Sequence, residues 1–157
     1  MEFRDLHTQY DVLHKEIDQA IKCVLASGQF IGGDPVKTFE KELADYLGVK
    51  HCITCANGTD ALKLALMAWG IGPGDAVLVP DFTFFSSGEV VSSVGAVPVF
   101  IDVLEDSFNL DPKKIESGVK AALQEGFKPR AVVAVDLFGR PADYSAIKQE
   151  CKRLGLL

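Results

Sequence analysis

A short glycine-containing turn, Asn57-Gly58-Thr59-Asp60, is the stretch of this chain best suited to bind a ligand. His51-Cys52-Ile53-Thr54 precedes it and is predicted to be a strand, and the apolar spacing over residues 62–68 predicts a helix after it. A helix that begins here directs free N–H groups and its positive dipole end out of the turn. Gly58 then lets a ligand approach the backbone, and Thr59 adds a hydroxyl, which suits the phosphate of a small molecule. Taken alone, the same residues also fit an ordinary turn with a plain helix cap.

The cysteines offer a second kind of chemistry. Cys52 and Cys55 have the C-x-x-C spacing, but zinc requires a second pair, and Cys23 and Cys151 do not form one. A redox pair would lie at the start of a helix, whereas a strand points these two side chains to opposite faces. We therefore expect no metal site and predict buried free thiols.

Composition restricts the class of protein. A chain of 157 residues with 48% hydrophobic and 24% charged residues is typical of about one globular domain. The net charge of −6, without a dense Lys/Arg cluster, argues against a nucleic-acid surface. No apolar run approaches the ~18 residues of a membrane span, and Met1–Asp5 does not resemble a secretory leader. We expect a cytoplasmic protein that binds neither nucleic acid nor membrane.

The apolar pattern predicts the elements that position the turn. A polar lead-in over residues 1–12 is followed by a helix over 13–27, and a second helix begins with Asp34 as its cap before Pro35 and ends at Gly48. Beyond the turn, strands are predicted at 76–80, 97–101 and 131–135, helices at 86–94, 112–125 and 143–153, and a further strand from Leu156.

This alternation of helices with nearly continuous apolar strands indicates an α/β fold with a mostly parallel, doubly wound sheet. Ligands bind to such sheets beyond the carboxyl ends of the strands. The Gly58 turn, the Phe82–Phe85 loop and the loop at Asp136 are three such exits. They form one pocket if their strands are parallel neighbours. The earlier loop Gly28–Gly33 carries Phe30 and Ile31, either as plugs for the core or as contacts for a partner or an active site.

Seven segments, each unspecific alone, become specific through their order and spacing. They are Phe3-Arg4-Asp5-Leu6, Ser27 to Gly33, Cys55 to Leu62, Gly72 to Asp75, Phe82-Thr83-Phe84, Gly95 to Asp102 and Val135 to Gly139. Together they resemble the DegT/StrS family of nucleotide-sugar aminotransferases, which are fold type I enzymes that use pyridoxal 5′-phosphate (PLP). The resemblance implies that residues 1–157 comprise lead-in helices and the first part of the PLP-binding large domain, without the rest of that domain or the C-terminal small domain.

The resemblance also implies roles for site residues. Gly58 and Thr59 would hold the PLP phosphate, with Asn57 and Asp60 beside them, and Phe84 would stack on the pyridine ring, although a core position is its alternative.

The remaining implied site residues concern the substrate and the partner subunit. Phe30, Ile31 and Gly32 match a loop that lies near the partner's active site in dimers of the family. Asp136 lies at a position where the family varies, so the resemblance gives it no role; from its place at a strand exit it is expected to line the substrate pocket.

The implied reaction moves an amino group from glutamate to a keto sugar nucleotide, with a 3-keto, UDP- or dTDP-linked sugar favoured. It would serve the biosynthesis of cell-surface polysaccharides or deoxyaminosugars, in a homodimeric enzyme. In the family the Schiff-base lysine lies further along than residue 157, so none of these 157 residues is expected to be catalytic and the chain alone is expected to be inactive. A PLP-dependent sugar dehydratase of the same fold and a non-catalytic fragment that binds a phosphate ligand or a partner are the alternatives.

Overall fold

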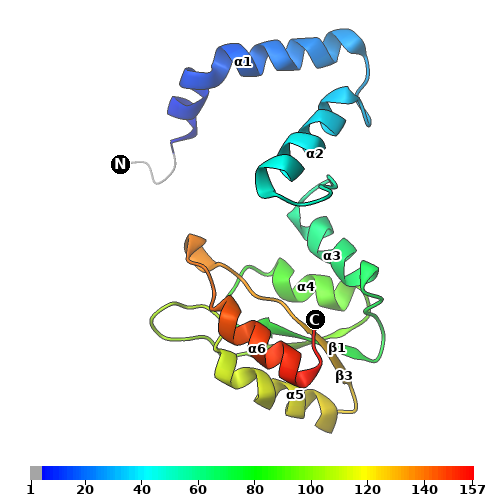
Figure 1. Ribbon diagram of the computed structural model, residues 1–157, viewed down its shortest axis with the longest axis vertical. Coiled ribbons are helices and arrows are strands. Elements are labelled where there is room, and N and C mark those ends of the chain that lie inside the picture. Colours follow the sequence, from blue (N-terminus) through cyan, green and yellow to red (C-terminus); the bar gives the residue numbers. More distant parts are fainter. Residues whose placement is uncertain (1–4) are drawn as a thin grey trace. The chain divides into compact units, whose positions relative to one another are not determined.

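The computed structural model describes residues 5–157, and the chain divides into two compact units (Figure 1). We call Met1–Thr54 the N-terminal unit and Cys55–Leu157 the sheet unit. The segment Phe3-Arg4, which is part of the family resemblance, lies outside the described residues.

Helix α1 (Leu6–Ser27) starts inside the predicted polar lead-in, so the prediction for residues 1–12 is wrong from residue 6 onward. The reason is a local cap. Asp5 accepts a 2.9 Å hydrogen bond from the backbone N–H of Thr8 and a 2.6 Å bond from the Thr8 hydroxyl. The predicted end of the helix is confirmed, because Gly28 adopts a left-handed φ of 66° that glycine tolerates best.

Helix α2 (Asp34–Leu47) ends as predicted, at a left-handed Gly48. Its start differs by one residue from the prediction. Gly33 is the N-cap and makes no side-chain cap, while Asp34 already belongs to the first turn, together with Pro35. The negative charge of Asp34 therefore stabilises the positive end of the helix dipole, but its side chain does not cap the helix.

The strand predicted at His51–Thr54 does not form. A strand needs a neighbour to satisfy its backbone, and no strand within residues 5–157 pairs with this segment. Ile53 is accordingly 84% exposed. The segment is tied to α2 instead, since Glu40 accepts hydrogen bonds of 2.8 Å from both the backbone N–H and the hydroxyl of Thr54. These bonds hold the pKa of Glu40 below its usual value.

The sheet unit contains the parallel strands β1 (Asp75–Pro80), β2 (Val97–Ile101) and β3 (Lys128–Val132), in the order β2-β1-β3. The register between β1 and β2 runs from Ala76 opposite Val97 to Pro80 opposite Ile101. The predicted strands at 76–80 and 97–101 are confirmed, and so is the parallel sheet.

Strand β3 begins three residues earlier than predicted, because its polar first residues conceal it in the apolar pattern. Arg130 is accommodated there by an ion pair with Asp75, at 3.4 Å. The sequence predicts that the strand continues to residue 135, but β3 ends at Val132. One more hydrogen bond of 2.8 Å follows, from the Val133 N–H to the Leu78 carbonyl, before the chain leaves the sheet. Leu157 donates to the Arg130 carbonyl and accepts from the Val132 N–H, both at 2.9 Å, which is the pattern of a parallel neighbour.

Helices cover both faces of this sheet (Figure 1). Helices α3 (Gly58–Ala68) and α4 (Ser86–Ser93) pack with each other on one face. Helices α5 (Ile115–Gln124) and α6 (Tyr144–Leu154) pack on the other, and a short 3₁₀ turn, η1, precedes α5. The chain is therefore doubly wound, as the sequence predicts.

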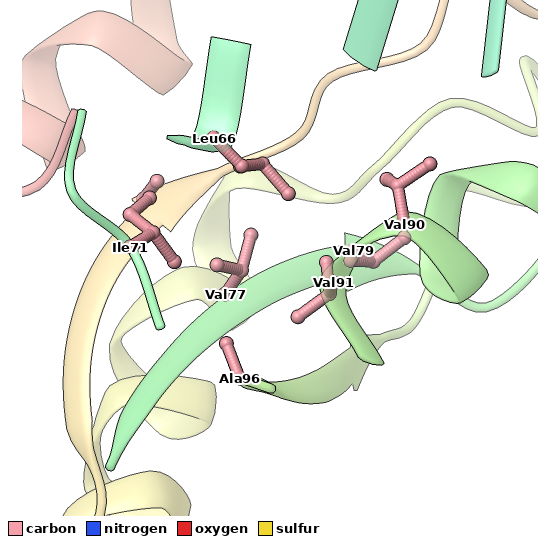
Figure 2. Packing of buried hydrophobic residues seen from close by; sticks show 8 residues of the cluster. Leu66, Ile71, Val77, Val79, Val90, Val91 and Ala96 are labelled. Carbon is pink, nitrogen blue, oxygen red and sulfur yellow. The ribbon is translucent and has the colours of Figure 1, made fainter. Parts of the chain in front are cut away.

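The central strand β1 divides the core into two layers. Val77 and Val79 face the α3–α4 side, whereas Leu78 faces the α5–α6 side, and all three are fully buried. A strand covered on both faces reads as a continuous apolar run, which explains why the sequence reveals β1 so clearly. Figure 2 shows the first layer, in which side chains from β1, α4 and the end of α3 interdigitate; its members include Leu66, Ile71, Val77, Val79, Val90, Val91 and Ala96.

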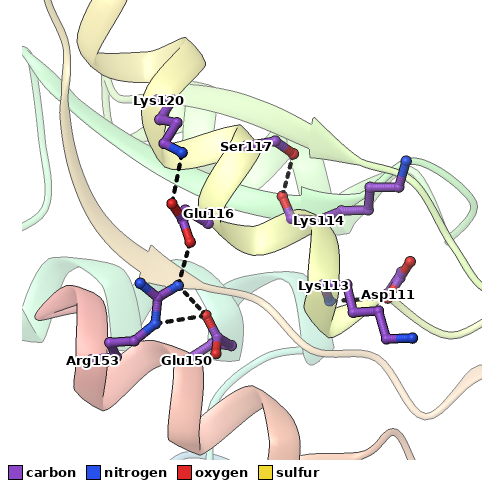
Figure 3. A network of polar contacts seen from close by, with 8 residues as sticks. All are labelled: Asp111, Lys113, Lys114, Glu116, Ser117, Lys120, Glu150 and Arg153. Carbon is purple, nitrogen blue, oxygen red and sulfur yellow. Dashed lines mark hydrogen bonds and ion pairs between the residues drawn. The ribbon is translucent and has the colours of Figure 1, made fainter.

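Charged side chains join the two helices of the second face (Figure 3). Arg153 of α6 bonds both Glu150 on its own helix, at 2.5 Å, and Glu116 on α5, at 2.6 Å. Lys120 reaches the other oxygen of Glu116 at 2.6 Å. All four groups are solvent-accessible, so the network orients α5 and α6 more than it stabilises them.

The cysteine prediction is confirmed only in part. All four thiols are free, but Cys151 alone is buried; Cys23 and Cys55 are exposed and Cys52 is intermediate. The other three thiols lie outside the layered core, so the prediction that they are buried is wrong. Within residues 5–157, no three Cys, His, Asp or Glu side chains are grouped to hold a metal. None of the described helices combines the length and apolar character needed to cross a bilayer.

Candidate functional site

The three strand exits singled out from the sequence line one cavity of about 450 Å³ in the sheet unit. Two of the three follow observed strands, since β1 and β3 pair in parallel and end at the same edge of the sheet. The Gly58 turn lines the cavity as well, although the strand expected before it does not form. The lining residues come from the α3 turn, from the loop after β1 and from the loop after β3: Gly58, Thr59, Leu62, Thr83, Phe84, Ser86, Ser87, Val135, Asp136, Leu137 and Phe138.

The start of α3 leaves backbone donors available at this cavity. Asn57 is the N-cap, and its side-chain oxygen accepts from the Asp60 N–H at 2.9 Å. The Asn57 carbonyl accepts from the Ala61 N–H at 3.1 Å. Within residues 5–157, no hydrogen bond engages the N–H of Gly58 or Thr59. A Cβ added to Gly58 would meet no atom within 4 Å, so the backbone here is open to a ligand.

Asn57 and Asp60 form hydrogen bonds with each other. Besides the cap, the Asn57 amide donates to the Asp60 carboxylate at 3.0 Å. Their structural role is therefore to fix the first turn of α3, and a direct role in ligand binding stays a prediction.

A second helix contributes to the same wall of the cavity. The Thr59 hydroxyl and the Ser86 hydroxyl, at the first residue of α4, are 2.9 Å apart, and Ser86 is only 8% exposed. Thr83 and Ser87 form a similar pair at 3.1 Å. The positive ends of two helix dipoles thus lie beside one group of hydroxyls, which favours an anion. These serines were not among the residues singled out from the sequence, although two serines at the start of a helix beyond a strand exit were the available signal.

Phe84 lies on the cavity with its ring 76% exposed. The alternative that Phe84 belongs to the core is therefore wrong for this unit. An accessible aromatic face beside two helix N-termini can hold a flat, electron-poor ring that carries a phosphate. The stacking role itself stays a prediction.

Asp136 lines the cavity, but its carboxylate serves its own loop. It accepts a 2.9 Å hydrogen bond from the Ala142 N–H. Burial, and secondarily the nearby Asp136 carboxylate, raise the pKa of Tyr144. The 3₁₀ turn η2 (Leu137–Gly139) follows directly, and within it Phe138 has a left-handed φ of 54°. Phe138 was not predicted as a site residue from the sequence.

The loop with Phe30, Ile31 and Gly32 belongs to the N-terminal unit and is described there alone. Phe30 is 68% and Ile31 is 96% exposed, so the alternative in which they plug a core is wrong. Together with Gln29 and Lys37 they line an open cavity of about 560 Å³. Their role toward a partner subunit stays a prediction.

Comparison with known proteins places these features in a wider group. The model of the DegT/DnrJ/EryC1/StrS aminotransferase family matches residues 11–157. The UDP-2-acetamido-2-deoxy-3-oxo-D-glucuronate aminotransferase of Pseudomonas aeruginosa is 40% identical over 156 residues, which are 99% of this chain and 42% of that protein. The chain thus spans about two fifths of the length of the curated relatives it matches.

Solved structures agree with the same grouping. The crystal structure of a DegT DnrJ EryC1 StrS aminotransferase from Brucella abortus has a TM-score of 0.95 and 48% identity, covering 99% of this chain and 42% of its own. The structure of NtdA from Bacillus subtilis with bound cofactor PMP has a TM-score of 0.81 and 32% identity, covering 90% of this chain and 31% of its own.

Proposed function

The chain belongs to the DegT/DnrJ/EryC1/StrS aminotransferase family, and from that membership we propose that the whole protein is a PLP-dependent aminotransferase acting on a keto sugar nucleotide. Glutamate is the proposed amino donor. The amino acceptor is a sugar with a 3-keto group, since the P. aeruginosa relative is named for a 3-oxo sugar linked to UDP. Biosynthesis of polysaccharides or deoxyaminosugars is the corresponding biological role.

One observation carries the proposal: the cavity combines anion donors with an aromatic face. The unengaged N–H groups of Gly58 and Thr59, the paired hydroxyls of Thr59 and Ser86, and the side chain of Phe84 belong to residues that line the same cavity. These groups fit a phosphate ester of a flat aromatic ring. The fit supports PLP in particular because the ring needs an accessible aromatic surface and Phe84 is exposed.

Each residue then has a distinct task. Gly58 and Thr59 would bind the phosphate through their backbone N–H groups, and the Thr59 hydroxyl would donate to it while accepting from Ser86. Phe84 would orient the ring and exclude water from one face of it. When bound, the cofactor supplies an electron sink for amino transfer, which is chemistry that side chains lack. The lysine that links to PLP is expected further along the chain than residue 157.

The first test changes the phosphate turn in the full-length protein. We expect Gly58→Leu to abolish PLP retention on dialysis, because the side chain fills space that the phosphate requires. The melting temperature without PLP should stay unchanged, since a Cβ at Gly58 meets no atom within 4 Å. Thr59→Ala should weaken PLP binding by about 1.5–3 kcal/mol, the scale of a hydrogen bond to a charged group.

Ala61→Leu is the matched control, because it places the same leucine side chain at an exposed position of the same helix that does not line the cavity. We expect this variant to retain PLP. If Gly58→Leu also retains it, the turn is structural only.

The second test addresses the reaction. Full-length protein with PLP, ¹⁵N-glutamate and a UDP-linked 3-keto sugar should yield a ¹⁵N-labelled amino sugar, detected by mass spectrometry. A dehydrated sugar without nitrogen would indicate the dehydratase alternative instead. Bound PLP with no product from any keto sugar nucleotide would favour the non-catalytic alternative.

We also propose that the full-length protein is a homodimer. The support within this chain is the accessible pair Phe30 and Ile31 on a glycine-bracketed loop. Exposed apolar side chains of this kind favour association. Sedimentation of the full-length protein should show a dimer that Phe30→Ser combined with Ile31→Ser weakens. A stable monomer in dilute solution would contradict the proposal.

A further inference from the structure

Phe138 is an aromatic residue whose position the fold maintains against local preference. Its φ of 54° lies in the left-handed region, which non-glycine residues rarely adopt. Its ring is 85% exposed, so burial in the core does not compensate for this backbone conformation. Strained residues that persist without a packing reason concentrate at ligand sites. Phe138 does line the cavity that contains Gly58, Thr59 and Phe84.

Asn109 holds the loop that carries Phe138. Its side chain is 3% exposed, and it bonds the loop on both sides of Phe138: the amide donates to the Arg140 carbonyl at 2.9 Å, and the oxygen accepts from the Leu137 N–H at 3.1 Å. A buried amide that is satisfied by one loop fixes the conformation of that loop. The clamp spans about 30 residues of sequence, so it is a tertiary constraint on η2.

The segment that contains Asn109 is itself anchored. An antiparallel bridge between Val103 and Leu110 closes it, and Leu110 is buried in the second core layer. Outside the core, the Arg140 side chain donates to the Asp106 carbonyl at 2.9 Å. The position of Phe138 is thus set by groups that do not themselves line the cavity.

We propose that Phe138 is a specificity-determining residue that contacts the sugar nucleotide at the rim of the cavity, and that Asn109 is its positioning residue. This inference rests on the proposed function. Phe138 is 85% exposed, whereas Thr59 is half-buried and Ser86, whose hydroxyl pairs with that of Thr59, is only 8% exposed, so the Phe138 ring meets the part of a ligand that projects from the cavity. In a transaminase the amino donor and the amino acceptor occupy that place in turn, and the proposed acceptor is the sugar nucleotide. An aromatic ring suits it, because sugars and nucleotide bases both present flat apolar faces.

The experiment uses full-length enzyme and measures KM for the keto sugar nucleotide, kcat, the PLP dissociation constant and the melting temperature. Phe138→Asn removes the ring but keeps a residue that tolerates the left-handed region. We expect KM to rise about tenfold, kcat and PLP affinity to change by less than about threefold, and the melting temperature to stay equal or increase. A merely structural role would not separate KM from stability in this way.

Phe108→Asn is the matched control. Phe108 also has a left-handed φ, of 56°, but its ring packs on Phe82 at a centroid distance of 5.5 Å and does not line the cavity. We expect a lower melting temperature and an unchanged KM.

Asn109→Leu tests the positioning role. It should raise KM as Phe138→Asn does, and the double variant should raise it no further, because both changes act through one ring. If Asn109→Leu does not fold, Asn109→Asp keeps the acceptor for Leu137 and loses the donor to Arg140, and it should show a smaller effect of the same kind.

The two proposals fail in different ways. If the wild type forms no amino sugar from any keto sugar nucleotide, the proposed function fails and this inference falls with it. If the wild type is active and Phe138→Asn leaves KM unchanged, only this inference is overturned. Additive effects of Asn109→Leu and Phe138→Asn on log KM would overturn the positioning role of Asn109.

Discussion

The two units of this chain contain comparable helices but very different amounts of buried surface. Helix α1 buries no residue and α2 buries only Ala44, although both carry apolar stripes. In the sheet unit, β1 contributes five buried residues in succession, from Ala76 to Pro80. The helices of the N-terminal unit are nevertheless well formed, with a side-chain cap at Asp5 and a left-handed glycine at the end of each.

The difference shows that caps and spacing specify a helix, whereas burial requires partners from distant parts of the sequence. Helical stability in proteins comes mainly from tertiary packing of the apolar face. Within residues 5–157 that packing is concentrated around β1. The free energy of unfolding should therefore depend strongly on the sheet unit and weakly on α1.

The largest expected effect is that of a cavity beneath β1. Leu78→Ala should lower the free energy of unfolding by about 2–5 kcal/mol, because the side chain is fully buried between β1, α5 and α6. Ile17→Ala in α1 removes a similar aliphatic group from a partly exposed position and should cost less than about 1 kcal/mol. Urea denaturation of the 157-residue chain, followed by circular dichroism, measures both. Equal losses would contradict the contrast between the units.

An effect of intermediate size is expected from overfilling the same layer. A Cβ on Gly118 of α5 would collide with the Ile101 side chain and come within 3.2 Å of Leu78. Gly118→Ala should therefore cost about 1–3 kcal/mol despite the better helix propensity of alanine. Glu16→Ala, at an exposed position of α1, should change stability by less than about 0.5 kcal/mol. A stabilising Gly118→Ala would mean that α5 can move away from the sheet at little cost.

The same contrast explains which elements the sequence reveals. Strands β1 and β2 and the helices that follow strands are legible because their apolar patterns are local and continuous. The strand expected at His51–Thr54 fails because pairing is not a local property. Strand β3 begins earlier than predicted because it includes Arg130, whose charge is paired with Asp75. An apolar pattern does not reveal a strand residue of this kind.

The candidate site divides in a similar way. The Gly58 turn and Phe84 are identifiable from residue type and from the family resemblance, because a helix start and a strand exit each leave a local signature. Asn109 has no such signature. In the sequence it is an ordinary turn residue, and its importance arises only when the loop at Leu137 folds back onto it. Ser86 likewise becomes a candidate site residue only through its 2.9 Å contact with Thr59, which is distant in the sequence.

The smallest expected effect compares one carboxylate from each unit. Lys120 first, and then Arg153, hold the pKa of Glu116 below its ordinary value of 4.5, whereas the bonds from Thr54 do the same for Glu40. A carboxyl whose pKa is lowered by folding stabilises the native state above the unfolded pKa, and this contribution is lost as the pH falls through the lowered native pKa. Both side chains are exposed, so each contribution is small.

Salt separates these two contributions. Glu116 interacts with full charges, which about 1 M salt screens, whereas Glu40 accepts hydrogen bonds from neutral groups, which salt affects little. Glu116→Gln and Glu40→Gln should each lower the melting temperature slightly at pH 7 in low salt, and less so as the pH falls below about 4.5. In about 1 M salt the effect of Glu116→Gln should disappear and that of Glu40→Gln should remain. Thermal unfolding of the wild type and both variants across pH and salt measures this. If salt removes both effects equally, the pKa of Glu40 is governed by charges and the hydrogen bonds from Thr54 are not its main cause.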